Sequence, residues 1–598
     1  MTIAPLRKVT LCGAQYEKTA ILEALQALGC MHLIALRPPP AEIEDIAPAD
    51  AAAAKKALRF LTVVPNRRRQ IVRDPGFDVG RFVETVSALM QRLREAGDHR
   101  DFLENRIAEV APWGDMVFPP LDRLKGRRLW FYRLPLRHLK TLKDCAYPWQ
   151  IVGRDNRFAY LVLIAPDEPP DNVLPVPRTH VGAKPLSALK EELEDVEIAL
   201  EELRAQRHGM TRYIYLLSVN LAEADNRASL AHAEQQTRDD GRIVALQGWV
   251  PEDALSAVEA IAEKQGLACL VEAPMPDDEP PTLIEQPEGM AAGRDLTLFY
   301  QVPDYRSWDP TIILVASFCV FFAMIVADAG YGVLLLLLLV FNWRRLGRSS
   351  TARAYRRLGV AIALCTIVYG VLVGSYFGAA PPPGSRLAAM KLLSVQDFPT
   401  MMRIAVTVGA LHVCLANAMI AYAHRGRRSA VAHVAWIAVI VGALALWLAD
   451  LTGPAARTGY GLIAAGFGTI LLFSSDRAVK RPRDWLLRLF DGVRSLPRAM
   501  NAFSDVLSYL RLFALGLASA SLAVTFNDLA TSAYRSLPGL GVLAAALILL
   551  FGHALNLGLG IMSGVVHGLR LNFIEFFNWG LPKEGTAFRR FARKEVQP

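Results

Sequence analysis

The second half of the sequence contains apolar runs long enough to cross a lipid bilayer, and no other feature limits the fold as strongly. A helix needs about 20 mostly apolar residues to cross the hydrocarbon core. Such runs occur at about 311–343, 358–378, 401–423, 430–451, 458–474, 499–530 and 540–579. The first run is too long for one span, and the two glycines of its ADAGYG segment can form a tight hairpin, so we expect two short spans there. The sequence thus predicts an all-α polytopic membrane domain of about eight transmembrane helices in residues 301–598.

Arginine and lysine are distributed unevenly between these runs, and the asymmetry gives an orientation. The segments that we place on the cytoplasmic side carry sixteen basic residues: Arg344, Arg345, Arg348, Arg353, Arg356, Arg357, Arg425, Arg427, Arg428, Arg477, Lys480, Arg481, Arg483, Arg488, Arg494 and Arg498. The opposite side carries five: Arg386, Lys391, Arg403, Arg457 and Arg535. Cytoplasmic loops are enriched in positive charge, so both termini are predicted to be cytoplasmic. The amphipathic segment from Asp484 to Val493 is expected to lie along the cytoplasmic membrane surface.

Residues 1 to about 300 have the pattern of a soluble α/β domain. Their apolar runs are short and are bounded by charged residues or proline. Alternating strand and helix patterns occur at about 8–36, 128–165 and 243–271. The acidic, proline-rich segment from Asp277 to Glu288 is expected to link this part to the membrane domain.

Long helices are expected between these α/β patterns. Apolar residues keep heptad spacing over 82–110 and again over 186–224, where only Arg207 interrupts the seam. Two heptad helices separated by a compact segment predict an antiparallel coiled coil. We therefore expect an elongated N-terminal domain in which two α/β lobes are joined by an antiparallel coiled coil. Two helices within an ordinary globular core are the alternative.

Several function classes find no support in the sequence. There is no GxxxxGK[ST] nucleotide-binding loop, and the seven cysteines lack the spacing of a metal site or a disulfide framework. The net charge of +9 lies mostly at the ends of membrane segments, which argues against nucleic-acid binding. The N-terminus lacks a signal-peptide pattern, so the first domain is expected to stay on the side where it is made. We expect no catalytic site, bound cofactor or metal in this chain.

One apolar run has an arginine at its centre. The segment from Ser504 to Ser521, SDVLSYLRLFALGLASAS, is predicted to be one helix with Arg511 in its middle. A central charge costs a membrane helix about 2.5–3.5 kcal/mol on insertion scales, so intramembrane arginines are mostly functional. The next run carries Arg570. No acidic residue shares the helical face of Arg511, and arginine does not release its proton, so we expect its partner to be a carboxylate on another protein.

Further polar residues lie on the same two predicted helices. Asn556, Ser563, His567 and Arg570 recur at intervals that place them on one helical face, along about 21 Å at 1.5 Å per residue. Such a stripe must face protein or water, and it predicts a polar path. As an alternative for the last member, Arg570 lies near a helix end and could extend to the membrane surface.

For the remaining titratable residues in the membrane half, the structural interpretation is favoured. Asp505 and Glu575 lie near the ends of spans, where a solvated carboxylate is expected. Asp328 is interpreted as a turn and capping residue. Three histidines are interpreted as structural side chains: His412, His553 and His567.

Two motifs resemble a known family. LSYLRLFALGLA at Leu507 to Ala518 and HGLRLNFIEFF at His567 to Phe577 resemble the two arginine motifs of the membrane stator subunit of V-type and A-type rotary ATPases, called subunit a or subunit I. The segments LTLFYQVPDYRSWDPT, FFAMIVADAGYG, GHALNLGLG and LQGWVP are similar to the same family. Ser519 and Gly560 stand where the eukaryotic branch has His and Glu, so the chain resembles the prokaryotic branch.

The resemblance implies a function. Arg511 and Arg570 would face a rotating ring of proteolipid subunits whose carboxylates carry H+ or Na+, and polar residues would line two offset half-channels. The candidates for these channels are Asp505, Ser508, Ser519, Asn556, Ser563, His567 and Glu575. Residues 1–300 would bind peripheral stalks, with a central-stalk cap subunit as a further partner. ATP would be hydrolysed by the partner subunits, and the location would be the prokaryotic cytoplasmic membrane.

Two other functions were considered. A secondary transporter with a cytoplasmic regulatory domain would be expected to show repeated halves and interrupted helices, and neither is evident in the sequence. A non-conducting membrane scaffold would leave Arg511 and the polar stripe unexplained.

Overall fold

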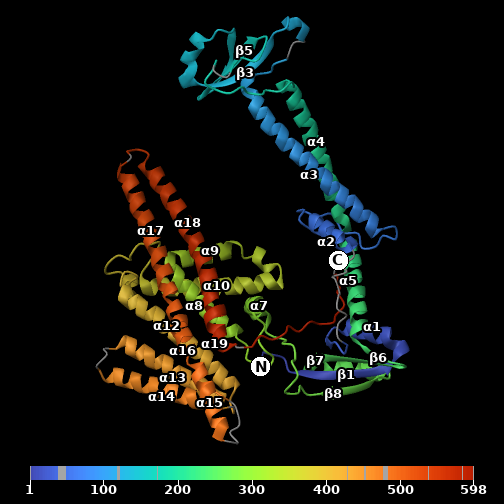
Figure 1. The fold of residues 1–598 in the computed structure, drawn as a ribbon, viewed down its shortest axis with the longest axis vertical. Helices are drawn as coiled ribbons and strands as arrows, with labels where there is room; N and C mark the ends of the chain where they lie inside the picture. The colour runs from blue at the N-terminus through green and yellow to red at the C-terminus, as the bar shows by residue number, and fades with distance from the viewer. Residues whose placement is uncertain are drawn as a thin grey trace. The chain divides into compact units, whose positions relative to one another are not determined.

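The computed structural model describes residues 2–596 except 38–48, 118–120, 171–172, 427, 450–452, 476–481, 537 and 582. Four of the basic residues assigned to the cytoplasmic side lie outside the described residues: Arg427, Arg477, Lys480 and Arg481. The chain divides into two compact units (Figure 1). The first contains Met1–Gln15, Cys30–Ile34 and Asp239–Phe591, and the second contains Tyr16–Gly29, Ala35–Arg238 and Ala592–Pro598. The functional division at residue 300 stays a prediction.

The second unit consists of helices and one small antiparallel sheet with the strand order β3-β5-β4. Its elements are α1 (Lys18–Leu28), α2 (Ala49–Thr62), α3 (Val79–Val110), β3 (Arg128–Pro135), β4 (Trp149–Arg154), β5 (Phe158–Ala165), α4 (Leu186–Met210) and α5 (Ile214–Gln236). Helix α3 begins where the Asp78 side chain accepts a hydrogen bond from the Arg81 backbone amide, as an N-cap residue does.

Helices α3 and α4 run antiparallel, α3 entering the small sheet and α4 leaving it (Figure 1). Near the sheet, Leu103 and Val110 of α3 share a buried cluster with Leu189 of α4. At the other end of α3, Val83 and Val86 pack with Ile214, which follows α4. The predicted heptad pairing of these two helices is therefore confirmed.

The expected single helix over 186–224 is wrong, because a 3₁₀ turn at Thr211–Tyr213 separates α4 from α5. The side chain of Gln70 donates to the Thr211 carbonyl at 2.9 Å and accepts from the Tyr215 amide at 3.1 Å. These bonds replace helical backbone bonds at the break. The heptad pattern continues across the turn, so the sequence alone did not reveal it.

The sheet of the first unit is antiparallel, with the strand order β2-β7-β1-β8 and β6 paired with β7. Its elements are β1 (Leu6–Ala14), β2 (His32–Ile34), β6 (Arg238–Asp240), β7 (Ile243–Pro251), α6 (Leu255–Lys264) and β8 (Ala268–Glu272). The register pairs Leu11 with Leu246 and Val9 with Gly248. At Gly248 a Cβ atom would lie 2.6 Å from the Met31 side chain, so this position needs glycine. The α/β patterns predicted at 8–36, 128–165 and 243–271 are confirmed.

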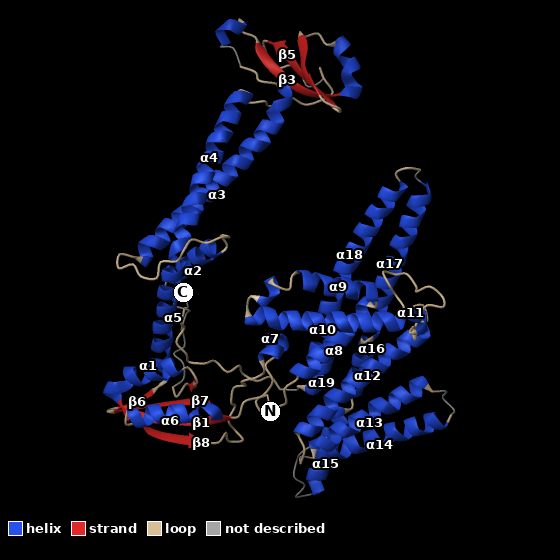
Figure 2. Cartoon of the chain, turned by 180° about the vertical axis from the view of Figure 1, so that it is seen from behind, coloured by secondary structure: helices blue, strands red, loops and turns tan. Residues whose placement is uncertain are grey.

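The rest of the first unit is helical (Figure 2). Its helices are α7 (Ala291–Tyr300), α8 (Thr311–Val326), α9 (Ala329–Phe341), α10 (Ser350–Val373), α11 (Arg386–Ala389), α12 (Phe398–Ala423), α13 (Ser429–Leu448), α14 (Pro454–Phe473), α15 (Pro482–Ser495), α16 (Arg498–Ser508), α17 (Leu510–Ser536), α18 (Gly541–Arg570) and α19 (Phe577–Gly580). A π-helix at Leu571–Phe576 joins α18 to α19. Helices α17 and α18 pack side by side along their length (Figures 1 and 2).

Within the described residues, six helical stretches are long and apolar enough to cross a membrane. They are Ser350–Val373, Phe398–Ala423, Ser429–Leu448, Ala456–Phe473, Trp485–Ser536 and Gly541–Gly580. The expected number of about eight is wrong by this measure, because α8 has 16 residues and α9 has 13. At 1.5 Å per residue they are about 24 and 20 Å long, which is less than the roughly 30 Å of the hydrocarbon core.

The chain turns between α8 and α9 at Ala327, which has a φ of 49°, and at Asp328, the N-cap of α9. The interpretation of Asp328 as a turn and capping residue is confirmed. The expected role of the glycines in this turn is wrong, because Gly330 and Gly332 lie inside α9. A Cβ atom at Gly330 would lie 2.5 Å from the ring of Phe377, so this glycine permits close packing instead.

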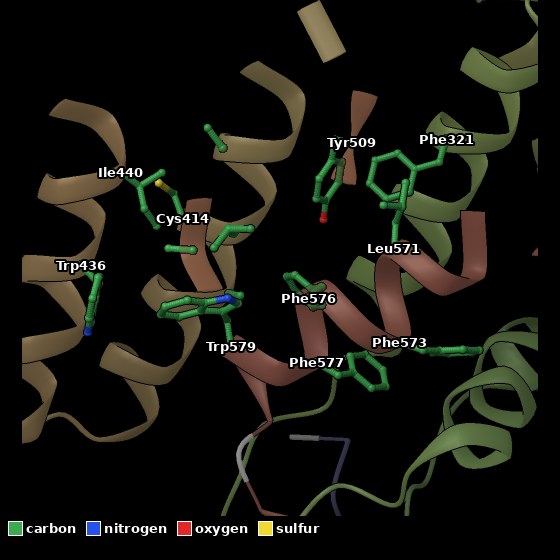
Figure 3. Close-up of a cluster of buried hydrophobic side chains, with 14 of the residues drawn as sticks. Phe321, Cys414, Trp436, Ile440, Tyr509, Leu571, Phe573, Phe576, Phe577 and Trp579 are labelled. Atoms are coloured by element: carbon green, nitrogen blue, oxygen red, sulfur yellow. The ribbon is translucent and has the colours of Figure 1, made fainter. Parts of the chain in front are cut away.

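A buried aromatic core joins the membrane helices to the C-terminal segment (Figure 3). Tyr509 follows α16, and Phe576 belongs to the π-helix. The ring of Phe576 stacks on His412 of α12 with centroids 4.2 Å apart. Trp579 of α19 packs edge-on against Trp436 of α13 at 5.5 Å. The C-terminal segment is thus fixed among helices that are far from it in the sequence.

Candidate functional site

Arg511 lies in the first turn of α17, directly after a break in the helix. The expected continuous helix from Ser504 to Ser521 is wrong, because α16 ends at Ser508 and α17 begins at Leu510. Tyr509 between them is fully buried, and its hydroxyl is 2.7 Å from His412 Nδ1. A Cβ atom at Gly409 would lie 2.6 Å from the Tyr509 ring, so α12 leaves space for this side chain. The residue at the break thus contacts a distant helix, and local periodicity cannot show such a contact.

Glu575 of the π-helix lies next to Arg511. Arg511 Nη1 is 3.8 Å from Glu575 Oε1, and the two side chains are 24% and 3% exposed. Two expectations are therefore wrong. Arg511 has an acidic neighbour in its own chain, and Glu575 is buried instead of solvated.

The arginine and the glutamate are both incompletely hydrogen-bonded. Within the described residues, Arg511 Nη1 and Glu575 Oε2 are buried without a hydrogen-bond partner. His567 Nδ1 is also buried without a partner, and His567 lies within electrostatic range of Arg511 and Arg570. Arg570 itself is exposed at the end of α18. The site therefore combines two guanidinium groups and one carboxylate with unfilled hydrogen-bonding positions.

The π-helix explains why Glu575 faces inward. Its extra residue per turn shifts the helical register relative to α18, and all of its residues except Ile574 are buried. Asn572 anchors the segment, because its Oδ1 accepts from Ser317 Oγ at 2.5 Å and its Nδ2 donates to the Gly568 carbonyl at 3.0 Å. If residues 571–576 continued α18 as an α-helix, Glu575 would lie on a different face of that helix.

The other predicted residues near Arg511 are engaged in local contacts. Asp505 is half-buried and accepts a hydrogen bond from Trp579 Nε1 at 2.7 Å, so the expectation of a solvated carboxylate is wrong here too. Ser508 donates to the Ser504 carbonyl at 3.0 Å. Ser563 is half-buried on α18, between Asn556 and His567.

A second polar cluster lies further along α17 and α18, on the side away from Arg570. Asn556 donates through Nδ2 to the Ser519 carbonyl at 2.9 Å and to the Tyr331 hydroxyl at 3.0 Å. The Tyr331 hydroxyl is 2.8 Å from His553 Nδ1. His553 Nε2 is 3.1 Å from Asn527 Oδ1. We call these five residues the outer network. The structure brings the candidates Ser519 and Asn556 together here, apart from Arg511.

The outer network borders a cavity and a capped helix. A cavity of about 1080 Å³ is lined in part by Asn527, His553, Tyr376 and Phe377. Asp328, at the start of α9, accepts from the amides of Tyr331, Phe377 and Gly378 and from the Ser375 hydroxyl, at 2.6–3.1 Å.

Comparisons with known proteins find relatives named subunit I of ATP synthases. No family model matches the chain. A V-type ATP synthase subunit I from Borreliella burgdorferi is 24% identical over 99% of both chains. V-type ATP synthase subunit I 1 from Treponema pallidum is 28% identical over 99% of this chain and 100% of its own length. An A-type ATP synthase subunit I from Methanocaldococcus jannaschii is 25% identical over 68% of this chain and 63% of its own. The chain is a homologue of the subunit I proteins.

The similarity to subunit I proteins includes both the α/β part and the helical part, because the bacterial matches cover nearly the whole chain. The resemblance seen in the sequence motifs is therefore confirmed. A solved structure titled as the cytoplasmic N-terminal domain of subunit I, homolog of subunit a, of V-ATPase aligns with 44% of this chain and 99% of its own. That alignment has 15% sequence identity and a TM-score of 0.23.

The structure adds residues that the sequence did not single out. Tyr509 and Tyr331 carry no signal in the sequence beyond their place within the family-like motifs. Within the described residues, no group of three or more His, Cys, Asp or Glu side chains could hold a metal ion.

Proposed function

We propose that this chain is the membrane stator subunit of a V/A-type rotary ATPase. In this role it forms, with a proteolipid ring, the path of H+ or Na+ that is coupled to ATP hydrolysis or synthesis. The observation that carries the proposal is Arg511, a guanidinium among apolar helices whose buried Nη1 has no hydrogen-bond partner among the described residues. The near full-length similarity to subunit I proteins agrees with it. The chain itself has no catalytic role, and ATP is hydrolysed by partner subunits.

Arg511 and Arg570 face the ring in this proposal. A ring carboxylate carries its ion in a neutral form through the membrane. Near a fixed positive charge, the ionised form of a carboxylate is stabilised, so the ion is released to one side. Arginine keeps its proton, so it cannot pass ions directly between the two sides. Ion flow is thereby coupled to movement of the ring.

The half-channels lie on opposite sides of Arg511. The outer path uses the cavity beside His553 and Asn527. The hydrogen bonds between Ser519 and Asn556 hold α17 and α18 together beside this path. The inner path uses four candidates from the same end of these helices: Asp505, Ser508, Ser563 and His567. The fifth candidate, Glu575, lies beside Arg511. Residues 301–598 form this ion path. In addition to the six longer helical stretches, α8 and α9 form a pair of short segments that each cross part of the membrane.

Residues 1–300 form the arm that holds the stator in place. Their partners are the peripheral stalk subunits and the central-stalk cap subunit. The chain is a multi-pass protein of a prokaryotic cytoplasmic membrane, with both termini on the cytoplasmic side. The paired helices α3 and α4 support this role, because their hydrophobic seam gives a stiff connection to the β3-β5-β4 sheet.

Substitution of Arg511 by alanine tests the proposal. We expect Arg511→Ala to assemble with the other subunits and to lose ATP-driven ion uptake into inverted membrane vesicles, down to background. Copurification of proteolipid and ATPase subunits is the measure of assembly. Uptake at the unsubstituted rate in an assembled complex would show that Arg511 is structural. Purification of the chain without ATPase subunits would favour a transporter instead.

A further inference from the structure

The pair formed by Arg511 and Glu575 is unusual in its geometry. At 3.8 Å the closest nitrogen and oxygen are within the range of an ion pair but too far apart for a hydrogen bond. Each partner also keeps a buried polar atom without a hydrogen bond. A pair built only for stability would be expected to close these bonds, because unsatisfied polar groups are costly in an apolar environment. The loose contact leaves both groups able to take another partner.

Three buried aromatic side chains lie next to the pair and connect the backbone near Arg511 to the backbone near Glu575. Tyr509 lies two residues before Arg511, and Phe576 directly follows Glu575. His412 connects them, since its Nδ1 is 2.7 Å from the Tyr509 hydroxyl and its ring stacks on Phe576 at 4.2 Å (Figure 3 shows Tyr509 and Phe576). The backbone positions of Arg511 and Glu575 are thus coupled through α12. This arrangement fixes the distance between them and leaves the ends of the side chains free to adjust.

The charges around Arg511 indicate what Glu575 does. Arg570 is within electrostatic range of Arg511, so the two guanidinium groups repel each other. Glu575 offsets part of this repulsion from a buried position. Asp505 has an oxygen bound to Trp579 Nε1, and within the described residues it forms no ion pair with either arginine. Glu575 is therefore the acidic group in contact with the site.

We propose that Glu575 is the resident counter-ion of Arg511, which stabilises the guanidinium between the visits of successive ring carboxylates and gives it up to each arriving carboxylate. The inference rests on the proposed function of the chain. The arriving carboxylate exchanges with Glu575 for the same guanidinium. Binding of the ring carboxylate is thereby weakened, and its release is made easier. Glu575 transfers no ion in this scheme.

The substitution Glu575→Gln tests the role, because it keeps the shape of the side chain and removes the charge. Without Glu575, Arg511 holds each ring carboxylate more tightly, so the ring dwells longer at every step. We expect an assembled complex whose ATP-driven ion uptake is at least about tenfold slower at every pH, with an unchanged pH optimum. Glu575→Asp should restore most of the rate, because it keeps the carboxylate.

Glu584→Gln is the matched control. Glu584 is exposed on the same C-terminal segment, and its substitution should leave uptake unchanged. An unchanged rate in Glu575→Gln would overturn the inference. A shifted pH optimum would also overturn it, because Glu575 would then be an ion-carrying group of a half-channel. Loss of assembly in Glu575→Gln would show a purely structural pair. If Arg511→Ala loses uptake while Glu575→Gln does not, the proposed function stands and only this inference fails.

Discussion

The two polar clusters on α17 and α18 differ in how completely their groups are bonded. In the outer network, the amide of Asn556 has two acceptors and both ring nitrogens of His553 have partners. Around Arg511, polar atoms of three side chains are buried and have no hydrogen-bond partner in the part of the chain that the structure describes: Arg511 Nη1, Glu575 Oε2 and His567 Nδ1. A closed network fixes helices relative to one another, whereas open positions suit a site that must accept a visiting group. We therefore expect substitutions in the outer network to act mainly on stability, and those near Arg511 to act mainly on transport.

Asp328→Asn should have the largest effect on stability. Each oxygen of Asp328 accepts two hydrogen bonds, and an amide can accept at only one of these positions. In its best orientation the NH₂ group donates to the Ser375 hydroxyl, but the Gly378 amide loses its acceptor and faces another donor. We therefore expect a loss of about 2–3 kcal/mol, measured by thermal unfolding in detergent.

Asp397→Asn is the matched control for this prediction. Asp397 is the N-cap of α12, but it is exposed and accepts from the single amide of Thr400. The free energy of unfolding lost in Asp397→Asn should be well under half of that lost in Asp328→Asn. If Asp328→Asn unfolded at the same temperature as the unsubstituted chain and yet lost ion uptake, Asp328 would belong with the functional cluster. The contrast between the two clusters would then be wrong.

The same contrast shows how far sequence could predict the site. The two arginine motifs and the polar stripe of α18 depend on local spacing, so they were recognised directly. The contact of Arg511 with Glu575 involves a π-helix and a helix break at Tyr509. The hydroxyl of Tyr509 bonds to His412, 97 residues away in the sequence. Glu575 was expected to be solvated because it lies near the end of a span, and that position in the sequence does not show that the π-helix buries it.

The fold was predicted to a similar degree. The α/β segments and the pairing of α3 with α4 follow from periodicity in single elements. The 3₁₀ turn at Thr211 depends on Gln70, which lies 141 residues earlier, and no local pattern records that contact. The predicted number of membrane-spanning helices was wrong for a different reason. Apolar composition does not show where a helix ends.

Tyr331→Phe should have a smaller effect than Asp328→Asn. The hydroxyl of Tyr331 contacts His553 and Asn556, and hydrogen bonds between membrane helices contribute about 0.6 kcal/mol on average and up to about 1.7. We expect a loss of about 1 kcal/mol in thermal unfolding, with ion uptake per folded complex unchanged. Tyr376→Phe is the control, because the Tyr376 hydroxyl is buried without a partner among the described residues and its removal should cost nothing. Equal losses in both variants would contradict the structural role of the outer network.

The smallest effect is expected for an ordinary ion pair in the second unit, which serves as a reference for the buried pair at Arg511. Lys594 Nζ donates to Asp225 at 2.7 Å, and the two side chains are 66% and 27% exposed. This hydrogen bond lowers the pKa of the Asp225 carboxyl below its usual value. Burial opposes the shift, and the attraction to Lys594 and Lys55 adds to the lowering. A lowered pKa in the folded state stabilises the fold above the unfolded pKa of about 3.9, and this contribution is lost as the pH falls through the folded value.

Exposed pairs contribute about 0.2–1 kcal/mol, so Asp225→Asn should only loosen the C-terminal segment. We expect faster amide exchange at residues 592–596 at pH 7, no change in thermal unfolding, and convergence with the unsubstituted chain as the pH approaches 3. Glu202→Gln, at an exposed position of α4, should leave the exchange unchanged. A loss as large as that of Asp328→Asn would mean that exposure does not weaken charge pairs in this protein. The missing hydrogen bonds at Arg511 would then not be evidence that Arg511 exchanges one carboxylate for another, because a purely structural pair could show the same geometry.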